Sequence, residues 1–116
     1  MKREFRLYLE DIIESILLIE EFTADMDFEQ FRKDEKTKNA VIKRLEVIGE
    51  ATKNVPKHIT EKYPGLPWSR MARMRDKLSH EYFGIRLDIV WKAVKESLPE
   101  IKPKIENILK DMEKGQ

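Results

Sequence analysis

Apolar residues recur every three or four positions over most of the chain, and this period constrains the fold more than any other feature. In the first segment they are Phe5, Tyr8, Leu9, Ile12, Ile13, Ile16 and Ile19. Such spacing places the side chains on one stripe of an α-helix. The sequence therefore predicts a helix of about five turns from about Lys2 to Phe22.

Further helices are expected wherever this period recurs between helix-breaking residues. Their predicted ranges are about 28–31, 34–54, 58–63, 68 to 80 or 82, and 87 onward. Pro56 ends the second long helix, and Pro64-Gly65-Leu66-Pro67 separates it from the third. Pro99 and Pro103 are expected to break or offset the last apolar stripe, which otherwise continues to about Met112.

The sequence predicts an all-α bundle of about four main helices, because no alternation of apolar and polar residues is long enough for a sheet. The length of 116 residues fits one domain, 1–113, with a frayed tail at 114–116. The absence of cysteine excludes disulfides and thiolate metal sites and suits a cytoplasmic protein. No apolar run is long enough to span a membrane.

Two positions in the second long helix have alternative interpretations. Gly49 marks either the close approach of another backbone or a tolerated defect that costs about 1 kcal/mol relative to alanine. Glu50 is either an exposed helix former or a polar group turned toward a site. Trp68 and Trp91 are interpreted as packing residues rather than as platforms for nucleic-acid bases.

The stretch from 68 to 86 carries a local excess of positive charge, although the net charge of the chain is only +1. Its cations are Arg70, Arg73, Arg75, Lys77 and Arg86, and its acids are Asp76 and Glu81, which leaves +3. Such a patch can attract phosphates, so Arg70, Arg73 and Lys77 are candidate contacts for RNA phosphates. The competing interpretation is an ordinary solvated helix face.

Arg75, His80 and Tyr82 are the strongest candidates for an active site. Histidine exchanges its proton near neutral pH, and the chain has only His58 and His80. In RNA cleavage His80 would act as the base on the ribose 2′-hydroxyl or as the acid to the leaving oxygen. Arg75 would stabilise the negative charge of the transition state. These two groups are sufficient for cleavage without a metal ion.

Helix geometry sets a condition on this site. Five residues turn a helix by about 500°, so Arg75 and His80 point about 140° apart. Asp76 lies four residues before His80 on the same face and can orient the imidazole. A break near His80, or a second copy of the motif across a two-fold axis, would bring Arg75 and His80 together. Ser69 and Ser79 are further candidates for hydrogen bonds to phosphate.

No metal or cofactor is expected. The sequence has no clustered carboxylates, its two histidines are far apart, and it lacks a glycine-rich phosphate loop. An Arg and a His this close also occur by chance in many helical proteins. His80 can therefore be a surface residue near a helix C-terminus, where a cation is favoured.

Several segments of the chain, taken in their order and spacing, resemble those of a known protein family. They are Asp34-Glu35-Lys36, Ala40-Val41-Ile42, 45–51, Pro67-Trp68, 74–83, Ile89-Val90-Trp91 and Leu98-Pro99. Read together, they resemble the HepT-like proteins of the HEPN superfamily. The resemblance covers about 9–109, which is nearly the whole chain.

This resemblance implies a HEPN-type up-and-down bundle of four to five helices that forms a symmetric homodimer. It also implies the toxin of a type VII toxin–antitoxin system, acting as a metal-independent endoribonuclease on RNA. The family's Arg-x4-His-x-Tyr motif falls on Arg75, His80 and Tyr82, with two copies meeting at the dimer interface. The implied partner is an MntA-type nucleotidyltransferase antitoxin, which transfers AMP to Tyr82. Asp76 stands where related motifs often have another polar residue, and it can weaken RNA binding or orient His80.

Two other functions compete with this one. The first is a non-catalytic HEPN module that binds a nucleotidyltransferase or a nucleotide. The second is a structural helical bundle without a site. Substitution of His80 by alanine would abolish toxicity only in a ribonuclease.

Overall fold

The computed structural model describes residues 4–80 and 86–115, except for the side chains of 75–80. Within these ranges the structure is helical and contains no strand, which confirms the predicted all-α class. Its long elements are α1 (Phe5–Thr23), α3 (Glu35–Lys53), α5 (Trp68–His80) and a rod made of α6 (Leu87–Lys92), the π-helical segment η2 (Ala93–Ser97) and α7 (Leu98–Lys114). Two short helices, α2 (Phe28–Lys33) and α4 (Lys57–Lys62), lie between them.

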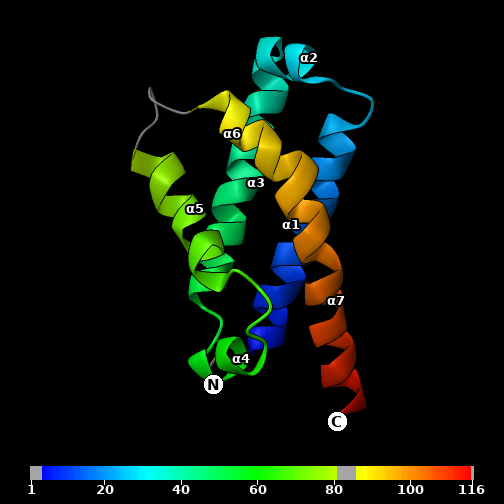
Figure 1. The fold of residues 1–116 in the computed structure, drawn as a ribbon, viewed down its shortest axis with the longest axis vertical. Coiled ribbons are helices and arrows are strands. Elements are labelled where there is room, and N and C mark those ends of the chain that lie inside the picture. Colours follow the sequence, from blue (N-terminus) through cyan, green and yellow to red (C-terminus); the bar gives the residue numbers. More distant parts are fainter. Residues whose placement is uncertain (1–3, 81–85, 116) are drawn as a thin grey trace.

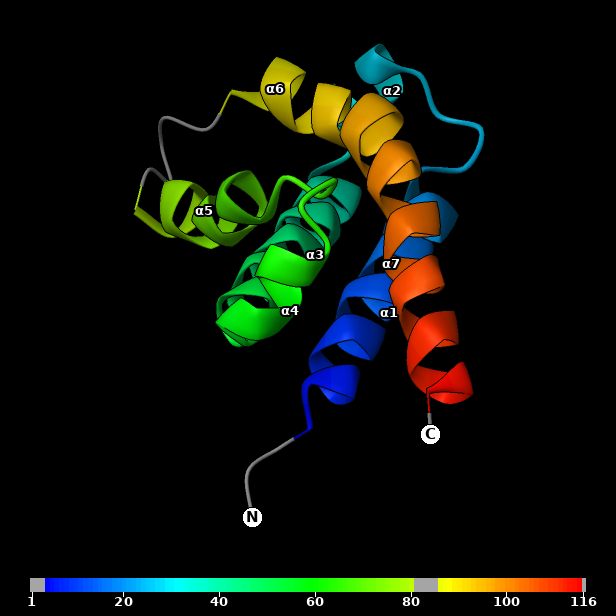
Figure 2. The same ribbon diagram turned by 60° about the horizontal axis from the view of Figure 1, so that its bottom comes forward.

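The long elements run alternately up and down (Figure 1). Helix α3 packs against α1 on one side and α5 on the other, while α7 packs against α1. Figure 2 shows α5 and α7 at opposite sides of the molecule, with α3 and α1 between them. The bundle measures 46 × 29 × 25 Å. Helix α5, which carries the predicted motif, therefore lies at one flank and is backed by α3.

The predicted apolar stripes form the core. The fully or nearly fully buried side chains include Leu9, Ile12, Ile16, Ile19, Val41, Leu45, Ile48, Met71, Val90, Val94, Ile105 and Ile108. Two buried threonines also lie in this region, and their hydroxyls donate to carbonyls four residues earlier, Thr23 to Ile19 at 2.8 Å and Thr52 to Ile48 at 2.7 Å. These bonds remove most of the cost of burying a hydroxyl.

The short helix α2 is stabilised by its N-terminal capping box and by tertiary packing. Asp27 accepts a hydrogen bond from the Gln30 N–H, and the Gln30 side chain accepts one from the Asp27 N–H, which completes a capping box. Phe31 is buried, and its ring centroid lies 4.9 Å from that of Trp91 in α6. A six-residue helix is unstable alone, so this aromatic contact with the rod holds it in place.

The two prolines near the start of α7 offset the last rod without breaking it. The chain continues from α6 through η2 into α7, and the Leu98 N–H bonds to the Ala93 carbonyl five residues earlier. Pro99 follows in the first turn of α7, while Pro103 lies inside the helix and is exposed. The wider turn of η2 absorbs the register change next to Pro99, where one backbone donor is missing.

The two positions of α3 with alternative interpretations differ in burial: Gly49 is buried, and Glu50 is exposed, as expected of a helix former. Both tryptophans pack partly against the core, as predicted.

Candidate functional site

Helix α5 begins where the proline-rich loop meets the core. The Pro67 carbonyl accepts the Met71 N–H at 3.0 Å, which starts the helix. The Trp68 indole N–H donates to the Tyr63 carbonyl at 2.8 Å, and the Met71 side chain is fully buried. These contacts fix the first turn of α5 to the loop and to the bundle, and so they set the position of every residue that follows on the helix.

The predicted motif lies at the far end of α5. The helix continues without interruption to His80, so a break, which is one of the two arrangements that would bring Arg75 and His80 together, does not occur before that residue. Positions 75 and 80 consequently lie on different faces of α5, and a single copy of the helix does not align them. Tyr82 lies outside the described residues, as do the side chains of Asp76, Lys77 and Ser79.

The arginines around α5 differ in their partners. Arg70 is exposed and has no hydrogen bond or ion pair in the described part of the chain. Arg73 is exposed and donates to the Ser69 hydroxyl at 3.2 Å. Arg86 instead pairs with Asp88 at 2.8 Å, and this hydrogen bond lowers the pKa of the Asp88 carboxyl. Arg70 and Arg73 are therefore the described cations of this region that remain available to a phosphate.

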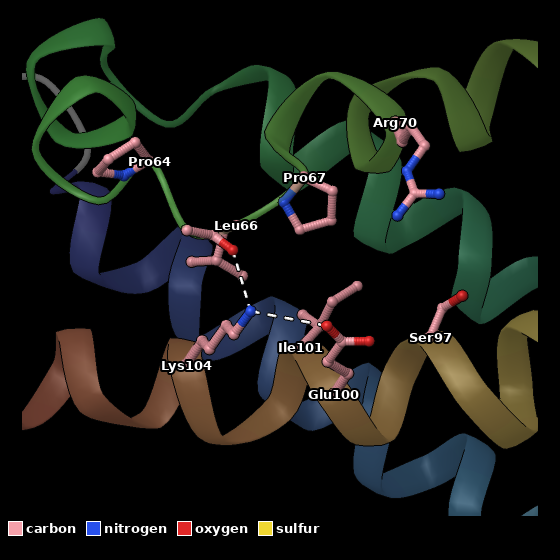
Figure 3. A pocket seen from close by; sticks show the side chains of 9 residues that line it. Pro64, Leu66, Pro67, Arg70, Ser97, Glu100, Ile101 and Lys104 are labelled. Atoms are coloured by element: carbon pink, nitrogen blue, oxygen red, sulfur yellow. Dashed lines mark hydrogen bonds and ion pairs between the residues drawn. The ribbon is translucent and has the colours of Figure 1, made fainter.

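A polar cavity of about 260 Å³ opens between the start of α5 and the junction of η2 with α7. Figure 3 shows the side chains of Arg70, Ser97, Glu100 and Lys104 directed toward this hollow, with Pro67 at its wall. The Lys104 ammonium donates to the Gly65 carbonyl at 3.0 Å and lies 3.8 Å from a Glu100 oxygen. Two cations from separate elements thus face one small space.

A second cavity of about 250 Å³ lies further along α5, against α3 and α6. Met74, Ile89 and Val90 contribute apolar walls, while Arg70 and Arg73 stand at its border. Ile89 is 47% exposed, as is Leu17 on α1. Arg70 lines both cavities, and each of them also has lining residues from the α6–η2–α7 rod.

Comparison with known proteins assigns the family. The family model described as "Ribonuclease HepT-like" matches residues 12–108. The chain belongs to the HepT-like ribonuclease family. Its predicted membership and its expected enzyme class are thereby confirmed at the level of the family.

Individual relatives cover almost the whole chain. "Probable ribonuclease HepT" of Thermococcus cleftensis is 54% identical over 110 residues, which are 95% of this chain and 100% of that protein. "Putative RNase MJ0127" of Methanocaldococcus jannaschii is 51% identical over 112 residues, 97% of this chain and 93% of the relative. "Gamma-glutamylcyclotransferase and putative RNase MJ0434" of the same organism is 41% identical over the full chain, which spans 52% of that relative. No solved structure matches the chain.

Three residues of this HepT-like protein that line the polar cavity have no role in the predicted site. They are Ser97, Glu100 and Lys104, whereas Arg70 is a predicted phosphate contact. They lie on a different element from Arg70, in a stretch whose pattern reads as an ordinary amphipathic helix. No local signal in the sequence indicates that this stretch faces Arg70.

Two further structural findings concern metals and membranes. The described residues contain no group of three or more histidine, aspartate or glutamate side chains able to hold a metal ion. Among the helices described, none is both long and apolar enough to cross a membrane.

Proposed function

We propose that this protein is a metal-independent endoribonuclease in which Arg75 and His80 carry out the reaction. The observation that supports this most directly is family membership over 12–108, a range that contains the whole Arg-x4-His-x-Tyr motif. His80 removes the proton from a ribose 2′-hydroxyl, and Arg75 stabilises the phosphorane-like transition state. Attack by that hydroxyl on the adjacent phosphorus expels the 5′-oxygen of the next nucleotide and leaves a 2′,3′-cyclic phosphate.

The other predicted residues have supporting parts in this proposal. Asp76 orients the His80 imidazole, and Ser79 donates a hydrogen bond to phosphate. Positive charge on α5 attracts the RNA backbone, with Arg70, Arg73 and Lys77 as its sources.

We further propose that the active form is a symmetric homodimer. Helix α5 is continuous through His80, so Arg75 and His80 of one copy lie on different faces of it. A second copy of the motif across a two-fold axis supplies the missing group. In this arrangement each site combines groups from both subunits, and residues 1–113 form the single domain of each.

Regulation by a partner completes the proposal. The chain acts as the toxin of a type VII toxin–antitoxin system in the cytoplasm. An MntA-type nucleotidyltransferase transfers AMP to Tyr82, which adds negative charge and bulk beside the motif and repels RNA. Co-expression with such a partner should increase the intact mass of the wild-type protein by one AMP and leave Tyr82→Phe unchanged.

Cleavage of total RNA in EDTA tests the catalytic proposal. The wild-type protein should produce fragments with 2′,3′-cyclic phosphate ends, and His80→Ala should produce none. Equal cleavage by both proteins would rule out His80 as the catalytic group. Absence of cleavage by an unmodified wild-type protein would instead favour the non-catalytic HEPN module.

A further inference from the structure

We propose that the polar cavity lined by Arg70, Ser97 and Lys104 binds a backbone phosphate of single-stranded RNA, several nucleotides away from the cleaved bond. This inference rests on the proposed ribonuclease function and names a second contact for the same substrate. The site is built from the start of α5 and from the η2–α7 junction, whereas the catalytic motif lies at the other end of α5.

The cations of this cavity are available to a ligand. Arg70 has no hydrogen bond or ion pair in the described part of the chain, so no described residue uses any of its five N–H donors. Its planar fork matches two oxygens of a phosphate. A surface arginine that faces a cavity without an acidic partner is therefore ready to receive an anion.

A hydrogen bond to the backbone positions the Lys104 ammonium at the cavity, where it can contact an anion. Its ammonium donates one of three N–H groups to the Gly65 carbonyl at 3.0 Å, which fixes the tip of the side chain at the cavity. Glu100 lies 3.8 Å away, with 75% of its side chain exposed. At that exposure the carboxylate can swing into solvent when an anion arrives, and the loss of such a surface pair costs little.

The remaining groups of the cavity also suit a phosphate. The Ser97 hydroxyl can donate a hydrogen bond, and Figure 3 shows it facing the hollow from the side opposite Arg70. A volume of about 260 Å³ accepts a phosphate with its ester groups. The nearby first turn of α5 adds a partial positive charge to that of the two cations.

The distance between positions 70 and 80 along α5 determines how many phosphates separate the bound phosphate from the cleaved bond. Positions 70 and 80 are separated by ten residues, or about 15 Å of helix. A nucleic-acid strand carries one phosphate per 3.4 Å or more of its length, so the two sites are separated by about four phosphates or fewer. A dinucleotide has a single phosphodiester and can occupy only the catalytic site, whereas a strand of about ten nucleotides reaches both.

Binding of a fluorescent ten-nucleotide RNA tests the proposal. Its 2′-hydroxyls are methylated, so it cannot be cleaved and the wild-type protein can be compared with every variant. Arg70→Ala combined with Lys104→Ala should raise the dissociation constant about tenfold and lower the slope of log affinity against log salt by about 0.7, because one phosphate contact is lost. Arg70→Lys should have an intermediate effect, since charge remains without the fork.

Two variants exclude a general effect of charge or of misfolding. Lys110→Ala removes one positive charge, as Lys104→Ala does, from α7 at an exposed position that does not line the cavity, and it should change affinity less than about twofold. Glu100→Gln removes the competing carboxylate and should tighten binding about threefold. An affinity gain of this kind cannot result from a damaged fold. The proposal is overturned if the double variant binds like Lys110→Ala, or if the wild-type protein does not bind this RNA.

Dinucleotide cleavage separates this proposal from the catalytic one. His80→Ala should not cleave a dinucleotide, whereas the double variant should lose far less of its dinucleotide cleavage than of its affinity for the ten-nucleotide RNA. Loss of ten-nucleotide binding in the double variant, together with cleavage by His80→Ala, would overturn the catalytic assignment and keep the phosphate site. If inorganic phosphate binds the cavity but the double variant retains its RNA affinity, the cavity is a site for a free anion and the RNA proposal is wrong.

Discussion

Ser15 has a buried hydroxyl group that lacks a hydrogen-bond partner in the described part of the chain. Its side chain is fully buried in α1, and its hydroxyl has no partner among the described residues. A buried hydroxyl without a hydrogen bond costs about 1–3 kcal/mol. The sequence places this serine within an apolar stripe, where it interrupts a run of isoleucines and leucines.

Ser15→Ala should therefore stabilise the protein. The variant removes the unpaired hydroxyl and introduces a better helix former, with an expected gain of about 1 kcal/mol in the free energy of unfolding. Chemical denaturation measures this gain. Thr23→Val is the contrasting variant, because the Thr23 hydroxyl does donate to the Ile19 carbonyl and its removal should lower stability. A loss of stability in Ser15→Ala would mean that the hydroxyl has a partner after all.

Asp34 links α2 to α3 and makes stability depend on pH. Its carboxylate accepts the Thr37 N–H at 2.9 Å, and this backbone hydrogen bond lowers the pKa of the carboxyl below its usual value. A lowered pKa means that the charged form favours the folded state, so the stabilisation is present above the usual pKa and is lost as pH falls through the folded value.

Asp34→Asn isolates this effect. Asparagine still caps the helix but carries no charge, so the stability difference between wild type and variant should be present at pH 7 and shrink toward pH 3. Denaturation midpoints across this range measure the difference. Asp34→Ala should lose stability even relative to Asp34→Asn at neutral pH. A pH-independent difference between wild type and Asp34→Asn would contradict the assigned role of the charge.

At the scale of elements, the α6–η2–α7 rod carries two prolines that a regular helix would exclude. Pro99 stands in the first turn of α7, where the preceding π-helical segment has already changed the bonding pattern. Pro103 has no such accommodation and lies inside α7 with its ring exposed. A proline in a helix interior costs about 3 kcal/mol relative to alanine.

Pro103→Ala should accordingly raise the stability of the protein by about 1–3 kcal/mol, since it restores a backbone donor without emptying the core. Thermal unfolding followed by circular dichroism measures the effect. Pro99→Ala is the matched control and should gain less. If Pro103→Ala were destabilising, the proline would be required to direct α7 onto α1.

The elements were predictable to different degrees for physical reasons. The boundaries of α1 and α3 follow from local apolar spacing, so sequence reasoning came within a few residues of them. The π-helical geometry of η2 has no compositional signal, and only an offset near Pro99 was predictable. The polar cavity depends on how α5 faces the η2–α7 junction, which is a tertiary relation. The sequence therefore indicated Arg70 as a candidate phosphate contact, which stays a prediction, and gave no signal for Lys104 or Ser97.

At the scale of the whole molecule, the proposed two-fold arrangement has a direct physical consequence. If each active site needs two copies of the motif, both stability and activity depend on protein concentration. Light scattering should give twice the mass of the monomer. The midpoint of a single thermal transition should rise with protein concentration, and specific cleavage activity should fall on dilution. A monomer with undiminished activity at high dilution would contradict the dimeric site.

The contact between Arg6 and Glu113 links the first turn of α1 to the last turn of α7. Their side-chain atoms lie 3.6 Å apart, and α1 packs along α7. Because the first turn of α1 and the last turn of α7 are neighbours, a short linker could join these two helices and a circularly permuted chain could open at an exposed turn. The order of the helices along the chain could thus be changed without changing how they pack.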